Sequence, residues 1–324
     1  MRTVLRPFVV MAALGSGLAA AQTPLSIATG GTGGVYYPVG GGYAQIIDQY
    51  VEGYTATVEA TNASVDNVAF ISRGDADLAL ALADTVLAAY QGTGVFGPDG
   101  DLPQLSNLRA ITVAYTNAVH IITRADSDID SLQDLVGKRV SVGAPGSGTE
   151  VSANTILEAV GISYDDFAAV QRLGANETAD ALRDGAIDAG FWSGGVPTGA
   201  VLSLSETHDI RLVPVSDEEY EQIHAADPTL IRYTFPEGAY RGVGETASIG
   251  TPNLLIVAAE ADEELVYEFT KALFEHIDVV RNIHPSANET VPEAALDSPI
   301  PLHPGAIRYY EEIGLTVPDS LKAD

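Results

Sequence analysis

Residues 26–38, which read SIATGGTGGVYYP, decide how the rest of the chain is organised. A short apolar run gives way to four glycines and two threonines, then to two tyrosines and Pro38. Glycine adopts positive φ and lets backbone approach a ligand closely. Proline favours the first turn of a helix, where its missing N–H is not needed. The pattern predicts a strand, a loop of exposed backbone and the start of a helix.

This loop is a candidate anion site. The first N–H groups of a helix have no partner within the helix, and with the helix dipole they attract negative charge. A carboxylate suits that geometry. The alternative interpretation is a flexible turn, but the hydroxyls and aromatic rings among the glycines favour a site.

The first 21 residues predict export. Arg2 and Arg6 precede an apolar run over 8–18, and residues 19–21 are alanines, the pattern of a cleavable signal peptide. No later stretch has the length of a membrane span. We therefore expect a periplasmic or otherwise extracytoplasmic protein. The absence of cysteine excludes disulfides, thiolate metal sites and cysteine nucleophiles.

The charge is strongly acidic. The chain has 44 acidic and 16 basic residues, for a formal net charge of −28. Such a surface repels nucleic acid and anionic membranes, so we expect no nucleic-acid partner. It also repels anionic ligands at long range. An anion site on this chain must therefore be built locally, from backbone and hydroxyl donors.

Strands and helices alternate along the chain, which is typical of a parallel sheet covered by helices. We expect strands at 55–60, 77–83, 108–115, 118–123, 139–142, 168–173, 187–191, 210–214 and 253–258. Helices are expected at 38–51, 65–73, 85–90, 132–136, 151–160, 176–183, 262–280 and 306–313, with a further helix opening after 192–197.

Three glycine-containing loops, at 29–36, 144–149 and 192–197, follow strands and precede helices. Ligands of open α/β sheets bind at such strand ends. The loops fall in two halves of the chain, which predicts two lobes that close on a small ligand about a hinge. We expect a signal peptide at 1–21, a discontinuous lobe 1 at 22–122 plus 252–324, and lobe 2 at 123–251. Strand 253–258 is expected to return beside 118–123.

Motifs of catalysis are missing. A nucleophile elbow fails around Ser147 and Ser193, because glycine does not flank them on both sides at the required spacing. Phosphate-loop and dinucleotide patterns fail too. The six histidines lack metalloprotease spacing, and carboxylates are too abundant for any pair to be informative. We expect a protein that is not an enzyme and has no cofactor and no metal.

The remaining candidates are binding groups. Ser147 and Thr149 precede a helix and resemble an anion cradle, although ordinary N-capping explains them equally well. Tyr36, Tyr115, Trp192 and Tyr240 are candidate pocket walls, with core packing as the alternative. Trp192 is the strongest, since it ends a strand beside two glycines.

Two further polar residues are ambiguous. Asp84 either belongs to the site or caps its helix, and Asn67 faces either the cleft or solvent.

Several motifs occur in a fixed order along the chain: TGGTGGVYYP at 29–38, Glu59-Ala60-Thr61 with Ser64 and Asn67, Asp134-Leu135 with Gly137–Val140, GAPGSGTE at 143–150, Asp188-Ala189, Pro197-Thr198 and His303–Ala306. Together they resemble the TAXI family, the substrate-binding proteins of tripartite ATP-independent periplasmic (TRAP) transporters. They cover nearly the whole mature chain in order. Asn62-Ala63 and Ala83-Asp84 depart from the family pattern and put the substrate in question.

The resemblance implies a two-lobed, type II periplasmic-binding fold. It implies capture of a small organic acid or amino acid, such as glutamate, glutamine or 2-oxoglutarate, and its delivery to a TRAP membrane subunit. We expect a monomer. The alternatives are the same fold serving an ABC importer or a sensor kinase, and an enzyme on this scaffold.

Loops and resemblance together give the candidate ligand-binding residues Thr29, Gly30, Gly31, Thr32, Gly33, Gly34, Tyr36, Thr61, Ser64, Asn67, Asp84, Pro145, Gly146, Ser147, Gly148, Thr149, Trp192, Gly194 and Tyr240.

Overall fold

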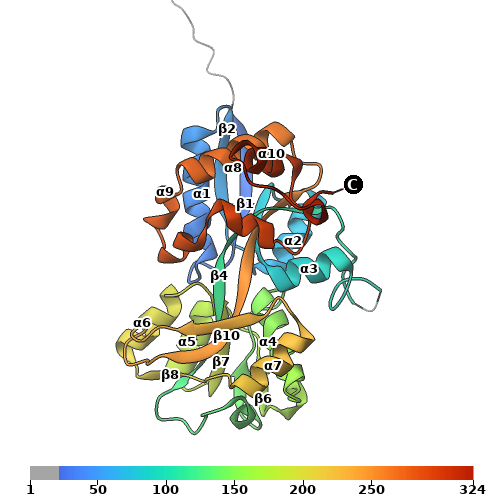
Figure 1. Ribbon diagram of the computed structural model, residues 1–324. Helices are drawn as coiled ribbons and strands as arrows, with labels where there is room; N and C mark the ends of the chain where they lie inside the picture. The colour runs from blue at the N-terminus through green and yellow to red at the C-terminus, as the bar shows by residue number, and fades with distance from the viewer. Residues whose placement is uncertain (1–21, 99, 324) are drawn as a thin grey trace, which may run out of the picture.

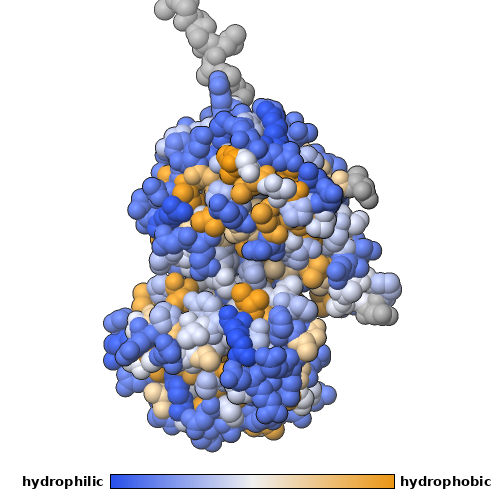
Figure 2. Space-filling view, in the orientation of Figure 1, coloured by the Kyte–Doolittle hydropathy of each residue, from blue (hydrophilic) through white to orange (hydrophobic). Residues whose placement is uncertain are grey.

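Two long antiparallel strands, β4 (Leu108–Arg124) and β10 (Thr246–Ala258), run through both halves of the molecule and join them (Figure 1). The computed structural model describes residues 22–98 and 100–323. The predicted signal peptide lies outside the described residues. Figure 2 shows two rounded lobes separated by a narrower waist, with mostly hydrophilic outer surfaces.

Each lobe has three parallel strands followed by one antiparallel crossing strand. In lobe 1 the order is β2 (Tyr54–Glu59), β1 (Thr23–Ala28), β3 (Leu78–Leu82), β10 and β4. In lobe 2 it is β6 (Ala169–Gln171), β5 (Arg139–Ser141), β7 (Ala189–Gly194), β4 and β8 (Ile210–Leu212). Strand β9 (Ile231–Phe235) pairs with the first half of β10. The same order in both lobes places the carboxyl ends of two parallel sheets face to face.

Helices cover the sheets. Lobe 1 carries α1 (Tyr36–Tyr50), α2 (Ser64–Arg73), α3 (Ala83–Gln91), α8 (Glu263–Glu275), α9 (Asp278–Arg281) and α10 (Pro304–Glu312). Lobe 2 carries α4 (Gly148–Ala159), α5 (Ala175–Arg183), α6 (Gly199–Thr207) and α7 (Asp217–Ala226). Short 3₁₀ turns complete the chain at Leu132–Leu135, Tyr164–Asp166, Pro285–Glu289, Pro292–Asp297 and Asp319–Leu321.

The apolar core divides along the crossing strands. One cluster of buried side chains draws on residues 25–115 and 254–321, and two others draw on residues 118–249. In lobe 1, every residue of β3, which reads LALAL, is buried. That is the pattern of a parallel strand covered on both faces. The division between clusters falls within β4 and β10, the same two strands in which the expected lobe boundaries lie.

Several sequence expectations are wrong in detail. Residues 108–124 form one strand, because Thr116 and Asn117 remain paired with β10 instead of turning. The segment 253–258 lies beside 108–113, not 118–123, since an antiparallel strand brings its second half to the first half of its partner. The expected helix over 262–280 is interrupted at His276 and forms α8 and α9. Helix α7 and strand β9 were not predicted.

Candidate functional site

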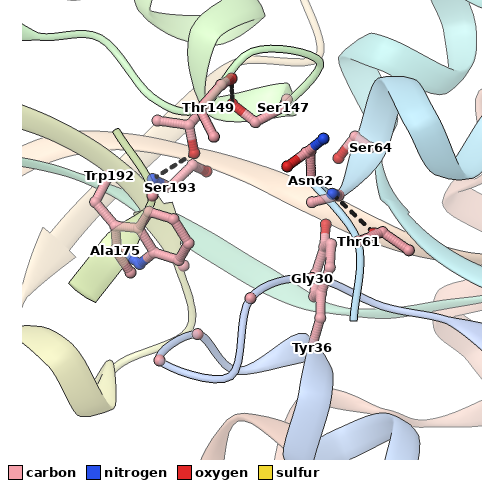
Figure 3. Close-up of a pocket in the computed structure, with 18 of the residues that line it drawn as sticks. Gly30, Tyr36, Thr61, Asn62, Ser64, Ser147, Thr149, Ala175, Trp192 and Ser193 are labelled. Carbon is pink, nitrogen blue, oxygen red and sulfur yellow. Dashed lines mark hydrogen bonds between the residues drawn. The ribbon is translucent and has the colours of Figure 1, made fainter. Parts of the chain in front are cut away.

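A cavity of about 470 Å³ lies between the lobes, where the strand ends meet. Lobe 1 lines it with the glycine loop 30–36, the segment 60–64 and Leu82; lobe 2 lines it with Ala144, residues 147–149, 172–177 and 192–194. Asn117 of β4 lines it from the crossing strands. Figure 3 shows the two sets of residues facing each other, with Tyr36, Asn62 and Ser64 opposite Thr149, Ser193 and Trp192.

Four helices begin at this cavity. Val35, Ala63 and Gly174 precede α1, α2 and α5, and within the described residues their side chains make no capping hydrogen bond. Each first turn leaves backbone N–H groups that have no partner inside the helix. At α2 the N–H groups of Val65 and Asp66 already donate to the Gly146 carbonyl. The first N–H groups and the dipoles of α1 and α5 therefore contribute most of the positive potential that helices bring to the cavity.

The lining residues carry two charged side chains, Arg172 and Glu177. Arg172 is in an ion pair with Glu150, with Nε 2.5 Å from Oε1, and its side chain is about half exposed. The positive charge at the rim is thus already shared with a carboxylate. An anion in the cavity would depend chiefly on backbone N–H groups and hydroxyls.

The glycine loop 30–36 packs closely against lobe 2. A Cβ on Gly33 would stand 2.2 Å from Oδ1 of Asn176, and one on Gly34 would stand 3.0 Å from Cζ2 of Trp192. A Cβ on Gly31, by contrast, would meet nothing within 4 Å. Gly33 therefore lies close to the exposed Asn176 side chain, whose amide would have to move if a Cβ were added.

Hydrogen bonds between the lobes surround the cavity. The Ala200 N–H donates to the Gly33 carbonyl at 3.2 Å, and the N–H groups of Val65 and Asp66 donate to the Gly146 carbonyl at 3.2 and 3.3 Å. These contacts are made only when the lobes are together. The structure therefore describes a closed arrangement.

Asp84 links the lobes from behind the cavity. It is the second residue of α3, not its cap, and its carboxylate accepts from the Ser152 hydroxyl of lobe 2 at 2.6 Å. Burial raises the pKa of Asp84 to about 6, although hydrogen bonds from Ser152 and Thr85 lower it. The side chain is 4% exposed and does not line the cavity.

Asn67 also lies behind the cavity. Its amide Nδ2 donates to the carbonyls of Thr29 and Leu80, at 2.6 and 2.7 Å, and its Oδ1 accepts from the Thr61 hydroxyl. The residue is fully buried, so neither expected orientation, toward cleft or solvent, is correct. Asn67 instead fixes the loops that do line the cavity.

The structure separates the candidate residues into two groups. Lining the cavity are Gly30, Gly31, Thr32, Gly33, Gly34, Tyr36, Thr61, Ser64, Ser147, Gly148, Thr149, Trp192 and Gly194. Outside its lining are Thr29, Asn67, Asp84, Pro145, Gly146 and Tyr240, and also the proposed wall residue Tyr115.

The Ser147 and Thr149 hydroxyls of lobe 2 have structural partners, whereas the buried Ser193 hydroxyl has none among the described residues. Ser147 caps α4, since its Oγ accepts from the Glu150 N–H at 3.2 Å and donates to the Ala144 carbonyl. The capping interpretation of Ser147 is therefore the one the structure supports. Thr149 Oγ1 accepts from the Ser193 N–H at 3.2 Å, which joins the second loop to the third.

Sequence reasoning missed one loop of the site, residues 172–177. Gly174-Ala175-Asn176 follows a strand and opens a helix, so the rule that found the other three loops applies to it as well. Asn62 and Asn117 were missed too. Asn117 sits within a strand, where no loop signal marks it.

A chain of polar side chains forms the floor at the crossing strands. The Tyr36 hydroxyl donates to Oδ1 of Asn253. The Nδ2 group of Asn253 in turn donates to Oδ1 of Asn117 at 2.8 Å and to the Tyr115 carbonyl at 2.9 Å. The pairing of β10 with β4 is irregular at this point, between Pro252 and Leu254. The side chain of Asn253 thus binds a strand carbonyl where the ladder is interrupted.

The described residues offer neither a membrane span nor a cluster of metal ligands. Across residues 22–98 and 100–323, no helix has the length and apolar character of a membrane span. In the same residues no three histidine, aspartate or glutamate side chains are grouped as a metal site requires.

Comparison with known proteins assigns the chain to a family. A model of the NMT1-like family matches residues 27–314, so the chain belongs to that family. Among solved structures it is similar to an ancestral arginine-binding protein bound to arginine, at 14% identity and a TM-score of 0.51, over 82% of this chain and 98% of that one.

Two further structures have a comparable likeness. One is a protein of Bordetella bronchiseptica, at 17% identity and a TM-score of 0.53, over 86% of this chain and 81% of the other. The second is a binding-protein component of an ABC phosphonate transporter from Pseudomonas aeruginosa, at 12% identity and a TM-score of 0.50, over 82% and 79%. The chain thus has the mixed α/β fold of periplasmic binding proteins, as expected from its sequence.

Proposed function

We propose that this member of the NMT1-like family is an extracytoplasmic receptor that captures a small carboxylate between its lobes and delivers it to a membrane transporter. The observation that carries the proposal is the convergence of four helix N-termini on one closed inter-lobe cavity. In two of them, α1 and α5, the first N–H groups have neither a side-chain cap nor a carbonyl partner among the described residues. Such N–H groups are matched by a carboxylate, whose oxygens only accept hydrogen bonds.

The charge of the lining supports a ligand that carries an ammonium group as well as a carboxylate. Glu177 lines the cavity, and the charge of Arg172 is shared with Glu150. An ammonium group on the ligand would be attracted to Glu177 and would offset one carboxylate charge, whereas 2-oxoglutarate has two carboxylates and no ammonium group. We therefore favour an amino acid of five carbons, glutamate or glutamine, over 2-oxoglutarate.

The transporter partner is proposed to be a TRAP membrane subunit. Support comes from the resemblance of the loops at 29–38 and 143–150 to the TAXI family. An ABC importer is the second candidate, because a binding-protein component of an ABC transporter shares this fold. A gene for a fused TRAP membrane subunit beside this one would decide for the first, and genes for an ABC permease and ATPase for the second.

Calorimetry on the ligand-stripped mature protein tests the proposal. L-glutamate and L-glutamine should bind with one site per chain, and 2-oxoglutarate more weakly. Recovery of each ligand unchanged after incubation tests the expectation that the protein is not an enzyme. If no amino acid or organic acid produces heat, the receptor proposal fails.

A further inference from the structure

Trp192, the single tryptophan of the chain, lies on the cavity wall. We propose that the buried pair Tyr240–His120 positions this indole and thereby sets the shape of the binding cavity without touching the ligand. Only the predicted effect on ligand affinity depends on the proposed receptor function. The positioning of Trp192 does not depend on it. Tyr240 and His120 are thus positioning residues. The sequence predicted Tyr240 as a wall of the pocket, whereas here it acts on the pocket through Trp192.

The evidence is a closed ring of hydrogen bonds that begins and ends on Trp192. The indole Nε1–H donates to Oγ1 of Thr198 at 3.2 Å, and the Thr198 N–H donates to the Tyr240 hydroxyl at 2.8 Å. That hydroxyl lies 2.7 Å from Nε2 of His120. Nδ1 of His120 lies 3.1 Å from the carbonyl of Trp192 itself. Both the ring and the backbone of Trp192 are therefore held.

The partners of His120 determine the direction of each bond. Nδ1 faces two carbonyl oxygens, those of Ala118 at 2.9 Å and Trp192, and carbonyls only accept. Nδ1 must then carry the proton, which leaves Nε2 as an acceptor for the Tyr240 O–H. The tyrosine oxygen in turn accepts from Thr198. Every member of the ring is satisfied by one arrangement of protons.

Burial makes the ring rigid. His120, Tyr240 and Thr198 are fully buried, and Phe235 packs edge-on against His120 with ring centroids 4.7 Å apart. Burial lowers the pKa of His120 to about 4, so the imidazole stays neutral and the ring intact at neutral pH. On its other side the indole lies against Gly34 of lobe 1. A shift of Trp192 would thus change both the cavity and the lobe contact.

The test is Tyr240→Phe, matched with Tyr43→Phe. Tyr43 is also fully buried, but its hydroxyl has no hydrogen-bond partner in the described part of the chain. Fluorescence excited where tyrosine does not absorb reports Trp192 alone. In ligand-free protein well below its melting temperature, we expect acrylamide quenching of Trp192 to rise about twofold in Tyr240→Phe and to stay unchanged in Tyr43→Phe.

The same variants are then titrated with L-glutamate. Affinity should fall about fivefold in Tyr240→Phe, because the indole is no longer held in the orientation that binds the ligand, and should stay unchanged in Tyr43→Phe. If wild-type protein does not bind L-glutamate, the ligand proposal fails while the quenching comparison still decides the role of Tyr240.

A second pair covers the event that Tyr240→Phe does not fold. Thr198→Ser keeps the hydroxyl that accepts from the indole, and Thr198→Val removes it. Quenching should match wild type in the serine variant and rise in the valine variant. Equal quenching of Trp192 in wild type and whichever disrupting variant folds, Tyr240→Phe or Thr198→Val, would overturn the proposal.

Discussion

The two lobes share one strand order, yet they line the cavity with different chemical groups. Lobe 1 presents a run of bare backbone, residues 30–34, beside the uncapped start of α1 and a few polar side chains. Lobe 2 presents the uncapped start of α5, the capped helix α4 and the larger side chains of Asn176 and Trp192. Bare backbone attracts any carboxylate. Side chains of defined shape discriminate between carboxylates. The difference suggests that lobe 1 captures the anionic group and that lobe 2 selects the rest of the ligand and locks the lobes together.

The largest predicted effect comes from placing a side chain on the lobe 1 surface. Gly33→Val should weaken ligand binding about 100-fold or more, close to 3 kcal/mol, because its side chain would block the approach of the ligand to the loop backbone and would displace the Asn176 amide. Gly41→Ala in α1 is the matched control and should bind like wild type, since Gly41 lies outside the cavity lining and no atom lies within 4 Å of the added carbon. Titration calorimetry measures both.

A double variant separates two causes of that loss. If lobe contact is responsible, Gly33→Ala combined with Asn176→Ala should bind better than Gly33→Ala alone, because the clash is with the asparagine side chain. If the ligand itself approaches the Gly33 backbone, removing Asn176 restores nothing. Unchanged affinity in Gly33→Val would contradict both and return the loop to a flexible turn.

The second prediction concerns the buried Asp84–Ser152 contact between the lobes. The folded pKa of Asp84 is raised to about 6, from the ordinary 3.8, so the folded state binds a proton more tightly than the unfolded state. The stability from this group is complete below pH about 4 and is lost as pH rises through about 6. Wild-type protein should therefore gain about 1 kcal/mol between pH 7 and pH 5 relative to Asp84→Asn.

Denaturant unfolding of both proteins at the two pH values measures this difference. The comparison with Asp84→Asn removes the contributions of other titrating groups, which the two proteins share. If the free energy of unfolding changed equally with pH in wild type and Asp84→Asn, the pKa of Asp84 would not be raised by folding. A relative loss at pH 5 would reverse the sign of the pKa shift.

The third prediction tests the capped helix of lobe 2 against the uncapped helices of lobe 1. Ser147→Ala removes the cap of α4 and should destabilise the protein by about 1 kcal/mol. Affinity should change less than about threefold, because the backbone N–H groups of α4 remain. A large loss of affinity with unchanged stability would instead make Ser147 a direct ligand, as the sequence also allowed. Thermal unfolding and calorimetry on one preparation distinguish the two.

The contrast between lobes also explains what the sequence could predict. The glycine loop 29–36 was found because backbone sites require glycine at fixed positions, and repeated strand–loop–helix units define the fold. Asn67 and Asp84 were identified as polar residues near the site, but their direction depends on packing: one binds carbonyls inside lobe 1, and the other reaches Ser152 in lobe 2. Which residues meet across the lobes is a tertiary property that local patterns do not encode.

The glycines of loop 29–36 fit both a binding site and a flexible turn, and the sequence alone does not distinguish these two interpretations. At Gly33 the close neighbour is Asn176 of lobe 2, a residue 143 positions away that no local rule connects to it.

Trp192 was expected at a strand end and instead lies within β7, which extends to Gly194. Its partners Thr198, Tyr240 and His120 are brought together only by the crossing strands.

The smallest effect is expected at the charged rim of lobe 2. Arg172→Gln should reduce affinity for L-glutamate less than about threefold, because the guanidinium is half exposed and already paired with Glu150. The variant also leaves Glu150 unpaired beside the cavity, so any loss should diminish as salt screens that charge. Titrations at low and high salt measure this. A loss of 100-fold or more would mean that Arg172 leaves Glu150 to bind the ligand, and lobe 2 would then supply the anion site now assigned to the backbone of lobe 1.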